Sequence, residues 1–124
     1  MSVPSFGASD PVSAILASAL DGVSLRQRVT ADNIANVDTP GFRASSVDFE
    51  SALRAAISSG AAEDPTFDGT TAALTPTDTP VGANGNNVDL RKESLSAMQS
   101  QFQYQVLTRA VSDRFDLIRF AAGQ

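Results

Sequence analysis

The last third of the chain, from Asp89 to Ala122, contains neither proline nor glycine. Asp89 and Glu93 near its start and Arg119 near its end are the charges that a helix dipole favours at those ends. An uninterrupted helix of this length would be a rod of about 50 Å, since each residue adds about 1.5 Å. Helices average only about 12 residues, so the predicted C-terminal core helix, residues 88–122, is the feature that any fold must accommodate.

The apolar residues of this predicted helix form two stripes. The first stripe runs along the helix at steps of three and four, with Asp113 as its one gap, and the second covers its last four turns. A single partner helix covers only one stripe, so we expect at least two neighbouring helices, of which the chain supplies one. The first stripe consists of Leu95, Met98, Phe102, Val106, Ala110, Leu117 and Phe120; the second consists of Leu107, Val111, Phe115 and Ile118. All of these except Ala110 are our candidate subunit-packing residues.

A second long helix is predicted over residues 11–37. Asp10 suits the N-cap and Pro11 the first helical position, where the missing N–H costs nothing. Apolar residues follow at helical spacing, and Gly22 is a weak point that costs about 1 kcal/mol relative to alanine. Pro40 disfavours helical backbone at the residue before it, so the helix should end near Val37.

The rest of the chain offers less regular structure. Residues 1–10 read as a flexible N-terminus, and residues 38–57 read as an elbow followed by a short helix that includes Val47 and Phe49. Residues 58–87 are rich in Gly, Pro, Thr and Asn and read as flexible. The predicted fold is mainly α: long N- and C-terminal helices packed as an antiparallel coiled-coil-like hairpin, with an irregular, partly disordered middle. Such a hairpin leaves apolar surface exposed, which marks an interaction site.

Composition excludes several functions. The chain has no cysteine and no histidine, which removes disulfides, thiolate chemistry and the commonest general base. Its net charge of −5 and scattered basic residues argue against nucleic acid and anionic lipid. No stretch is long and apolar enough to insert in a membrane, and the N-terminus lacks the pattern of a cleaved signal peptide.

Two polar clusters were considered as catalytic or metal sites. The carboxylates Asp32, Asp38, Asp48 and Glu50 have no histidine, cysteine or phosphate loop to organise them, so they are interpreted as solvated groups and caps. The segment ANGNNVDLRKE lacks the ligand spacing of a calcium loop, and its asparagines are interpreted as a lead-in to the last helix. We therefore predict no enzyme activity, no cofactor and no metal.

The segment NIANVDTPGFR ends the first predicted helix. Two asparagines three residues apart share one helix face and can bond the free carbonyls of the helix end. Pro-Gly indicates a type II turn, because proline fixes one central φ and glycine supplies a positive φ. We interpret the segment as a rigid elbow that sets the direction of the following chain. Its candidate residues are Asn33, Ile34, Ala35, Asn36, Asp38, Thr39, Pro40, Gly41 and Phe42.

These residues resemble the N-terminal signature of bacterial flagellar axial proteins, A-x-N-[IL]-A-N-x-x-T-x-G-[YF]. The matching positions are Ala31, Asn33, Ile34, Ala35, Asn36, Thr39, Gly41 and Phe42. Within the basal-body rod family, the chain is most similar to the FlgB-type proximal rod subgroup. The similarity rests on the DTPGF and VDF segments, the NGNNVDLRKE segment and the short length. The sister FlgC-type rod subunit is the nearest alternative, and a soluble helical adaptor or export chaperone is an alternative of another class.

The resemblance implies a structural subunit that assembles helically, with itself and other rod subunits, into the hollow drive shaft of the flagellum. That shaft transmits torque and lines the export channel. The resemblance further implies export through the flagellar type III apparatus without a cleaved signal peptide, a location in the periplasmic rod of the basal body, and contacts with MS-ring or adaptor proteins at the proximal end.

Overall fold

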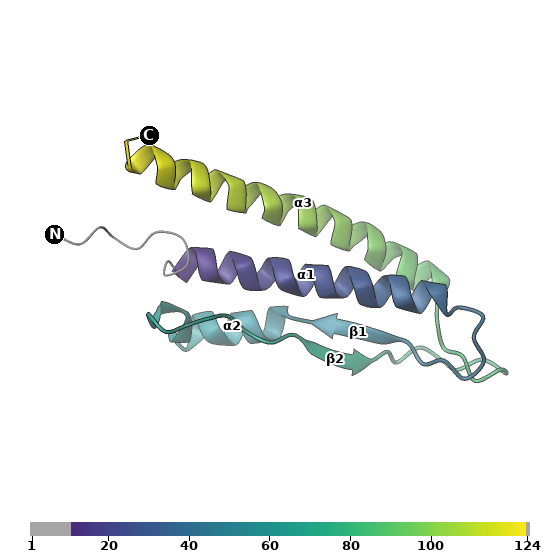
Figure 1. Ribbon diagram of the computed structural model, residues 1–124. Coiled ribbons are helices and arrows are strands. Elements are labelled where there is room, and N and C mark those ends of the chain that lie inside the picture. The colour runs from purple at the N-terminus through teal and green to yellow at the C-terminus, as the bar shows by residue number, and fades with distance from the viewer. Residues whose placement is uncertain (1–10, 124) are drawn as a thin grey trace.

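The protein is mainly helical, as the sequence predicts, and its elements form three layers, the middle one being a single long helix (Figure 1). The computed structural model describes residues 11–123. In chain order the elements are α1 (Pro11–Ala35), β1 (Ser45–Asp48), α2 (Glu50–Ser58), a 3-10 helix (Ala61–Glu63), β2 (Ala73–Pro76) and α3 (Leu90–Ala121). α1 is the middle layer, with α3 on one side and α2 and the strands on the other. The predicted flexible N-terminus and the Asp10 cap lie outside the described residues.

The two strands correct the predicted middle of the chain. β1 pairs antiparallel with β2, so that Ser45 lies opposite Pro76 and Val47 opposite Leu74. Val47 therefore belongs to a strand and not to the short helix, which begins only at Glu50. The expectation of an irregular middle is wrong for β2 and for the 3-10 helix. Strand pairing supplies the hydrogen bonds that this segment cannot make locally.

A small apolar core lies between α1, β1 and α2. It consists of Ala19, Val23, Val47, Phe49 and Leu53, and Leu107 of α3 packs against it from the other side. Gly22, predicted as a weak point of the helix, does not interrupt α1. A Cβ atom placed on Gly22 would lie 2.6 Å from both the Cβ and the Cδ1 of Phe49. The glycine therefore allows the Phe49 ring to lie directly against the helix backbone.

Arg26 joins three of the elements to α1. Its guanidinium donates two hydrogen bonds to the Glu50 carboxylate, at 2.6 and 2.9 Å, and one to the Val47 carbonyl at 2.6 Å. It also donates to Gln103 of α3 at 3.2 Å and lies 4.7 Å from the centre of the Phe49 ring. The hydrogen bonds from Arg26 hold the pKa of Glu50 below its ordinary value. One side chain thus ties α1 to β1, α2 and α3.

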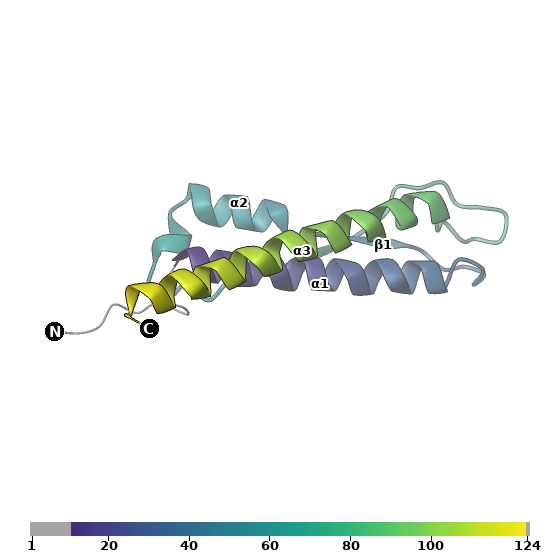
Figure 2. The ribbon, with the colours of Figure 1, turned by 90° about the horizontal axis from the view of Figure 1, so that it is seen from above.

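α1 and α3 pack together along a seam that is largely polar. Gln27 Nε2 donates to Gln101 Oε1 at 3.1 Å, and the hydroxyls of Thr30 and Ser96 lie 3.3 Å apart. Seen from above, α3 crosses over α1 at a shallow angle (Figure 2). None of the helices within residues 11–123 combines the length and the apolar character needed to cross a membrane.

Candidate assembly surface and elbow

The elbow begins with a tight turn at Thr39–Phe42. The Phe42 N–H donates to the Thr39 carbonyl at 3.2 Å, and Gly41 has φ +78°. Proline at the first central position and a positive φ at the second are the features of a type II turn. α1 ends at Ala35, two residues before the predicted end, because the backbone turns over residues 36–41.

Asn33 connects α1 to the free edge of β1. Its side chain donates to the Ser45 carbonyl at 2.7 Å and accepts from the Ser45 N–H at 3.2 Å. The side chain is 2% exposed. Because a buried backbone group without a partner is costly, Asn33 replaces the strand that would otherwise pair with Ser45.

Asn36 organises the end of the helix itself. Its Nδ2 donates to the Asp32 carbonyl at 2.8 Å, and its Oδ1 accepts from the Thr39 hydroxyl at 3.0 Å. The other predicted elbow residues have fewer contacts in this chain: Ile34 and Phe42 are half-buried, whereas Ala35, Asp38, Thr39, Pro40 and Gly41 are exposed. The exposed tip of the elbow is therefore available to other molecules.

Asn86 and Asn87 complete the elbow, and sequence reasoning missed both. Asn86 Nδ2 donates to the carbonyls of Asn36 and Thr39, at 2.8 and 2.7 Å. Asn87 Oδ1 accepts from the Ala44 N–H at 2.6 Å. Both side chains are buried. The signal in the sequence is the NGNN segment, whose local pattern indicates only a lead-in to α3.

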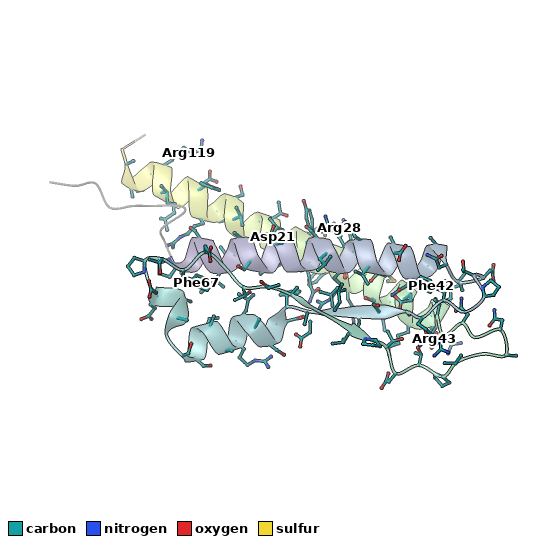
Figure 3. The ribbon with its side chains drawn as sticks, turned by 60° about the horizontal axis from the view of Figure 1, so that its bottom comes forward. Asp21, Arg28, Phe42, Arg43, Phe67 and Arg119 are labelled. Atoms are coloured by element: carbon teal, nitrogen blue, oxygen red, sulfur yellow. The ribbon has the colours of Figure 1, made fainter. Side chains whose placement is uncertain are left out.

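The turn containing Gly85 packs against the turn containing Gly41. The Gly41 N–H donates to the Asn84 carbonyl at 2.9 Å, and a Cβ on Gly85 would lie 3.3 Å from the Gly41 Cα. The end of α1 and the start of α3 are thus fixed to one another through a shared hydrogen-bonded structure. Figure 3 shows Phe42 and Arg43 at this end of the molecule and Phe67 at the other.

The two stripes of α3 have different environments. In the second stripe, Leu107, Val111 and Ile118 are half-buried, and Phe115 is 55% exposed. Every member of the first stripe except Ala110 is exposed, with Met98, Phe102 and Phe120 exposing 70%, 68% and 80% of their surface. In addition, residues 94–108 contain no charged residue. The chain therefore covers one stripe of α3 and leaves a long, uncharged face open, the kind of surface that binds another protein.

A groove lies between the first half of α1, the loop at residues 67–68 and the second half of α3. Its volume is about 570 Å³. We call it the α1–α3 groove, and it is lined by Ser13, Ala14, Leu16, Ala17, Ser18, Leu20, Asp21, Phe67, Asp68, Val111, Arg114 and Phe115. A smaller hollow of about 300 Å³ lies beside Phe49, Phe102 and Val106. The surface thus combines an apolar helical ridge with an apolar groove.

Two of the four carboxylates that lie close in the sequence, Asp48 and Glu50, have structural partners. Asp48 accepts hydrogen bonds from the hydroxyl and the N–H of Ser51, at 2.7 and 3.0 Å, and these lower its pKa. Glu50 is bound by Arg26. Within residues 11–123, no cluster of three or more acidic residues is arranged to hold a metal ion.

Comparison with known proteins gives consistent matches. The family described as "Flagella basal body rod protein" matches residues 15–43. Flagellar basal body rod protein FlgB of Bacillus subtilis (strain 168) is 31% identical over 112 residues, covering 84% of this chain and 87% of that protein. The proteins of the same name from Borreliella burgdorferi and Escherichia coli (strain K12) are 32% and 34% identical. They match 80% and 70% of this chain and 86% and 75% of their own lengths.

Proposed function

This chain belongs to the flagellar basal-body rod protein family and is a structural subunit of the rod; we propose that it completes its fold by assembling helically with its neighbours into a hollow drive shaft. The shaft transmits torque and lines the export channel. The observation that supports this proposal is the exposed first stripe of α3. Burying a large apolar side chain contributes about 1.5–3 kcal/mol, so covering this stripe is a substantial driving force for assembly.

The core of the shaft is built from α1 and α3 as an antiparallel coiled-coil-like hairpin. Two side-chain pairs between the helices support the antiparallel direction: Arg26 contacts Gln103, and Thr30 contacts Ser96. The residue number rises along α1 from the first pair to the second and falls along α3. The second stripe of α3 faces α1 in this arrangement. The first stripe, with Phe115, forms the contacts between subunits.

The elbow is the joint between this helical core and the β1–α2 layer. Asn33, Asn86 and Asn87 are buried and fully engaged in it, while its tip at residues 38–41 is exposed. A rigid joint with an exposed tip fixes the angle between layers and contacts the next subunit. This role explains why so polar a segment follows the first helix.

The proposal extends to location and partners. The subunit is exported by the flagellar type III apparatus without a cleaved signal peptide and takes its place in the periplasmic rod. Its proximal end contacts MS-ring or adaptor proteins, and its other contacts are with copies of itself and with other rod subunits. The relatives compared above are FlgB proteins, so the comparison does not favour the alternative that this chain is the sister FlgC-type subunit.

The charge-bearing variant Phe115→Asp tests the proposal. Phe115 is 55% exposed in the single chain, so the variant should retain its helix content by circular dichroism. In an assembly the charge would be buried without a partner, which is costly, and basal bodies purified from a strain lacking the wild-type chain should contain no variant. Ser112→Asp, which adds the same charge at an exposed polar position of α3, is the matched control and should support motility. Normal motility with Phe115→Asp would contradict the proposal.

Hydrogen exchange on the isolated chain gives an independent test. If neighbours complete the fold, amides of α3 should exchange faster in the free chain than in purified basal bodies. A free chain with full protection throughout α3 and a single sharp melting transition would favour the alternative of a self-sufficient adaptor. Such an adaptor would also form a small complex of fixed stoichiometry and would be absent from the rod density in cryo-electron microscopy of basal bodies.

A further inference from the structure

We propose that the α1–α3 groove of one copy receives the first stripe of α3 from the next copy, with Arg91 of the incoming helix against Asp21 and Asp68 of the groove. This inference rests on the proposed function and names the surfaces that join like subunits. The partner is a second copy of this chain.

The symmetry of a helical assembly requires two different surfaces on each subunit. A helical assembly of one kind of subunit needs a heterologous contact, in which two different and complementary surfaces of the same chain meet. The chain carries such a pair: the convex, exposed stripe of α3 and the concave groove of about 570 Å³. Both surfaces are predominantly apolar. Phe115, which lies in the groove and is 55% exposed, would be covered by the incoming helix.

The exposed charges of the stripe and of the groove are complementary. Residues 91, 95, 98, 102, 106 and 109 follow one another at steps of three and four, so Arg91 and Arg109 bracket the first half of the stripe, from Leu95 to Val106, on the same helix face. Both arginines are exposed. The groove carries two exposed carboxylates, Asp21 and Asp68, and one half-buried cation, Arg114, so the exposed charge that it presents is negative. Because the whole chain has a net charge of −5, copies repel one another in general, and a local pairing of opposite charges selects this contact.

The direction of the incoming helix follows from the way α3 packs on α1 within one chain. Copies joined by a heterologous contact in one filament point the same way. The incoming α3 therefore has the same direction relative to α1 as the α3 of the same chain. Within one chain, Arg26 contacts Gln103 and Thr30 contacts Ser96, so residue numbers rise along α1 as they fall along α3. The start of the stripe, at Arg91, then lies at the Asp21 end of the groove. Figure 3 shows Asp21 on α1 and Phe67 on the loop in the same half of the molecule.

This direction fixes a register along the groove. Leu95 follows Arg91 by four residues, and Ala17 precedes Asp21 by four, so these two positions should face each other between copies. Within one chain they are far apart: α3 residue Ser96 lies beside Thr30, and the 13 residues from Ala17 to Thr30 correspond to about 20 Å of helix. A contact between the two positions therefore reports a contact between copies.

Disulfide crosslinking tests the register directly, because the natural chain has no cysteine. Two single variants, Ala17→Cys and Leu95→Cys, carry different tags and are produced together in cells that assemble rods. After mild oxidation, basal bodies should contain the mixed dimer in roughly tenfold excess over controls, since a disulfide requires Cα atoms within about 7 Å. The controls pair Leu95→Cys with Ala55→Cys, at an exposed site on α2, and Ala17→Cys with Val106→Cys, which lies 11 residues further along the stripe than Leu95.

A charge exchange tests the ionic part in the same crosslinking background. Asp21→Arg on the groove copy should lower the mixed dimer by about threefold or more, because an exposed charge pair is worth up to about 1 kcal/mol and the change converts attraction to repulsion. Arg91→Asp on the stripe copy should restore it. Circular dichroism of each single variant checks that the fold is retained, and a purely structural role of either residue would give no such restoration.

Several outcomes would overturn the contact. These are basal bodies that contain both variants but no mixed dimer, dimers only between identical positions, preferential pairing of Ala17→Cys with Val106→Cys, or crosslinks of Leu95→Cys to other rod subunits alone. In each of these cases the chain is still present in the rod, so the proposed function survives. If the chain is absent from basal bodies altogether, the proposed function fails with the contact.

Discussion

Replacing Gly22 by alanine should destabilise the protein, although alanine is the better helix former. In a helix interior the change gains about 1 kcal/mol from propensity. Here, however, the new methyl group would lie 2.6 Å from the Cβ and Cδ1 of Phe49. Overpacking a core costs about 1–3 kcal/mol, and the Phe49 Cβ cannot move away without moving its backbone. Because this contact cannot relax easily, we expect a steric cost of about 2–3 kcal/mol, the upper part of that range, which leaves a net loss of about 1–2 kcal/mol.

Urea unfolding followed by circular dichroism measures this loss. With a slope of about 1–3 kcal/mol per molar urea, the midpoint of Gly22→Ala should fall by about 1 M. Asp21→Ala is the matched control, because the neighbouring site is exposed and gains propensity without the contact, so its midpoint should stay or rise. In a Phe49→Ala background the penalty should shrink, since alanine lacks the Cγ and Cδ1 atoms that, with Cβ, would contact the new methyl group. A Gly22→Ala protein as stable as the wild type would refute the reasoning.

Three further predictions follow from single side chains. Ser100→Ala should raise the free energy of unfolding by up to about 1 kcal/mol, and the urea midpoint with it. The reason is that the buried Ser100 hydroxyl has no hydrogen-bond partner among the described residues. A lower midpoint would show that the hydroxyl is bonded. Glu50→Gln should cost less than about 1 kcal/mol at pH 7, since the carboxylate is part-exposed. Arg26 lowers the Glu50 pKa below 4.5, so the stability that the ionised Glu50 contributes is present above about pH 4.5 and is lost as the pH falls through the folded-state pKa. The urea midpoints of the wild type and of Glu50→Gln should therefore differ above about pH 4.5 and converge in acid. Gly41→Val should destabilise the elbow by about 1–3 kcal/mol and reduce motility, because Gly41 has φ +78°, whereas Gly41→Asn should cost less; equal stability of the valine variant would exclude the type II turn.

The helices could be predicted because their signals are local. The Asp89 side chain accepts from the Lys92 N–H at 3.2 Å, as an N-cap does, and uninterrupted apolar periodicity marks α3. The strands could not be predicted in the same way. β2 is four exposed residues, and its partner β1 lies far away in the sequence. Its pairing is decided by tertiary contacts, and not by an alternating pattern.

The elbow shows the same limit within one site. The sequence identified Asn33 and Asn36 from their spacing at a helix end, which is a local feature. It could not show that Asn86 and Asn87 bond the same segment, because those contacts bridge more than 40 residues. Gly22 is a related case: local propensity marks it as a weakness, and only the position of the Phe49 ring shows why a side chain is excluded there.

The seam between α1 and α3 explains why such a chain can be both ordered and dependent on its neighbours. The part of the seam nearest the elbow contains small or polar residues, among them Thr30, Ser96 and the fully buried Ser100. Such residues contribute little hydrophobic free energy, and their hydrogen bonds exchange for bonds to water at a net gain of only about 1 kcal/mol each. α3 is therefore held mainly by the asparagine-rich elbow at its start and by half-buried residues such as Leu107. A helix that is fixed in direction at one end but weakly held along its length is positioned for assembly while retaining its largest apolar face for the next subunit.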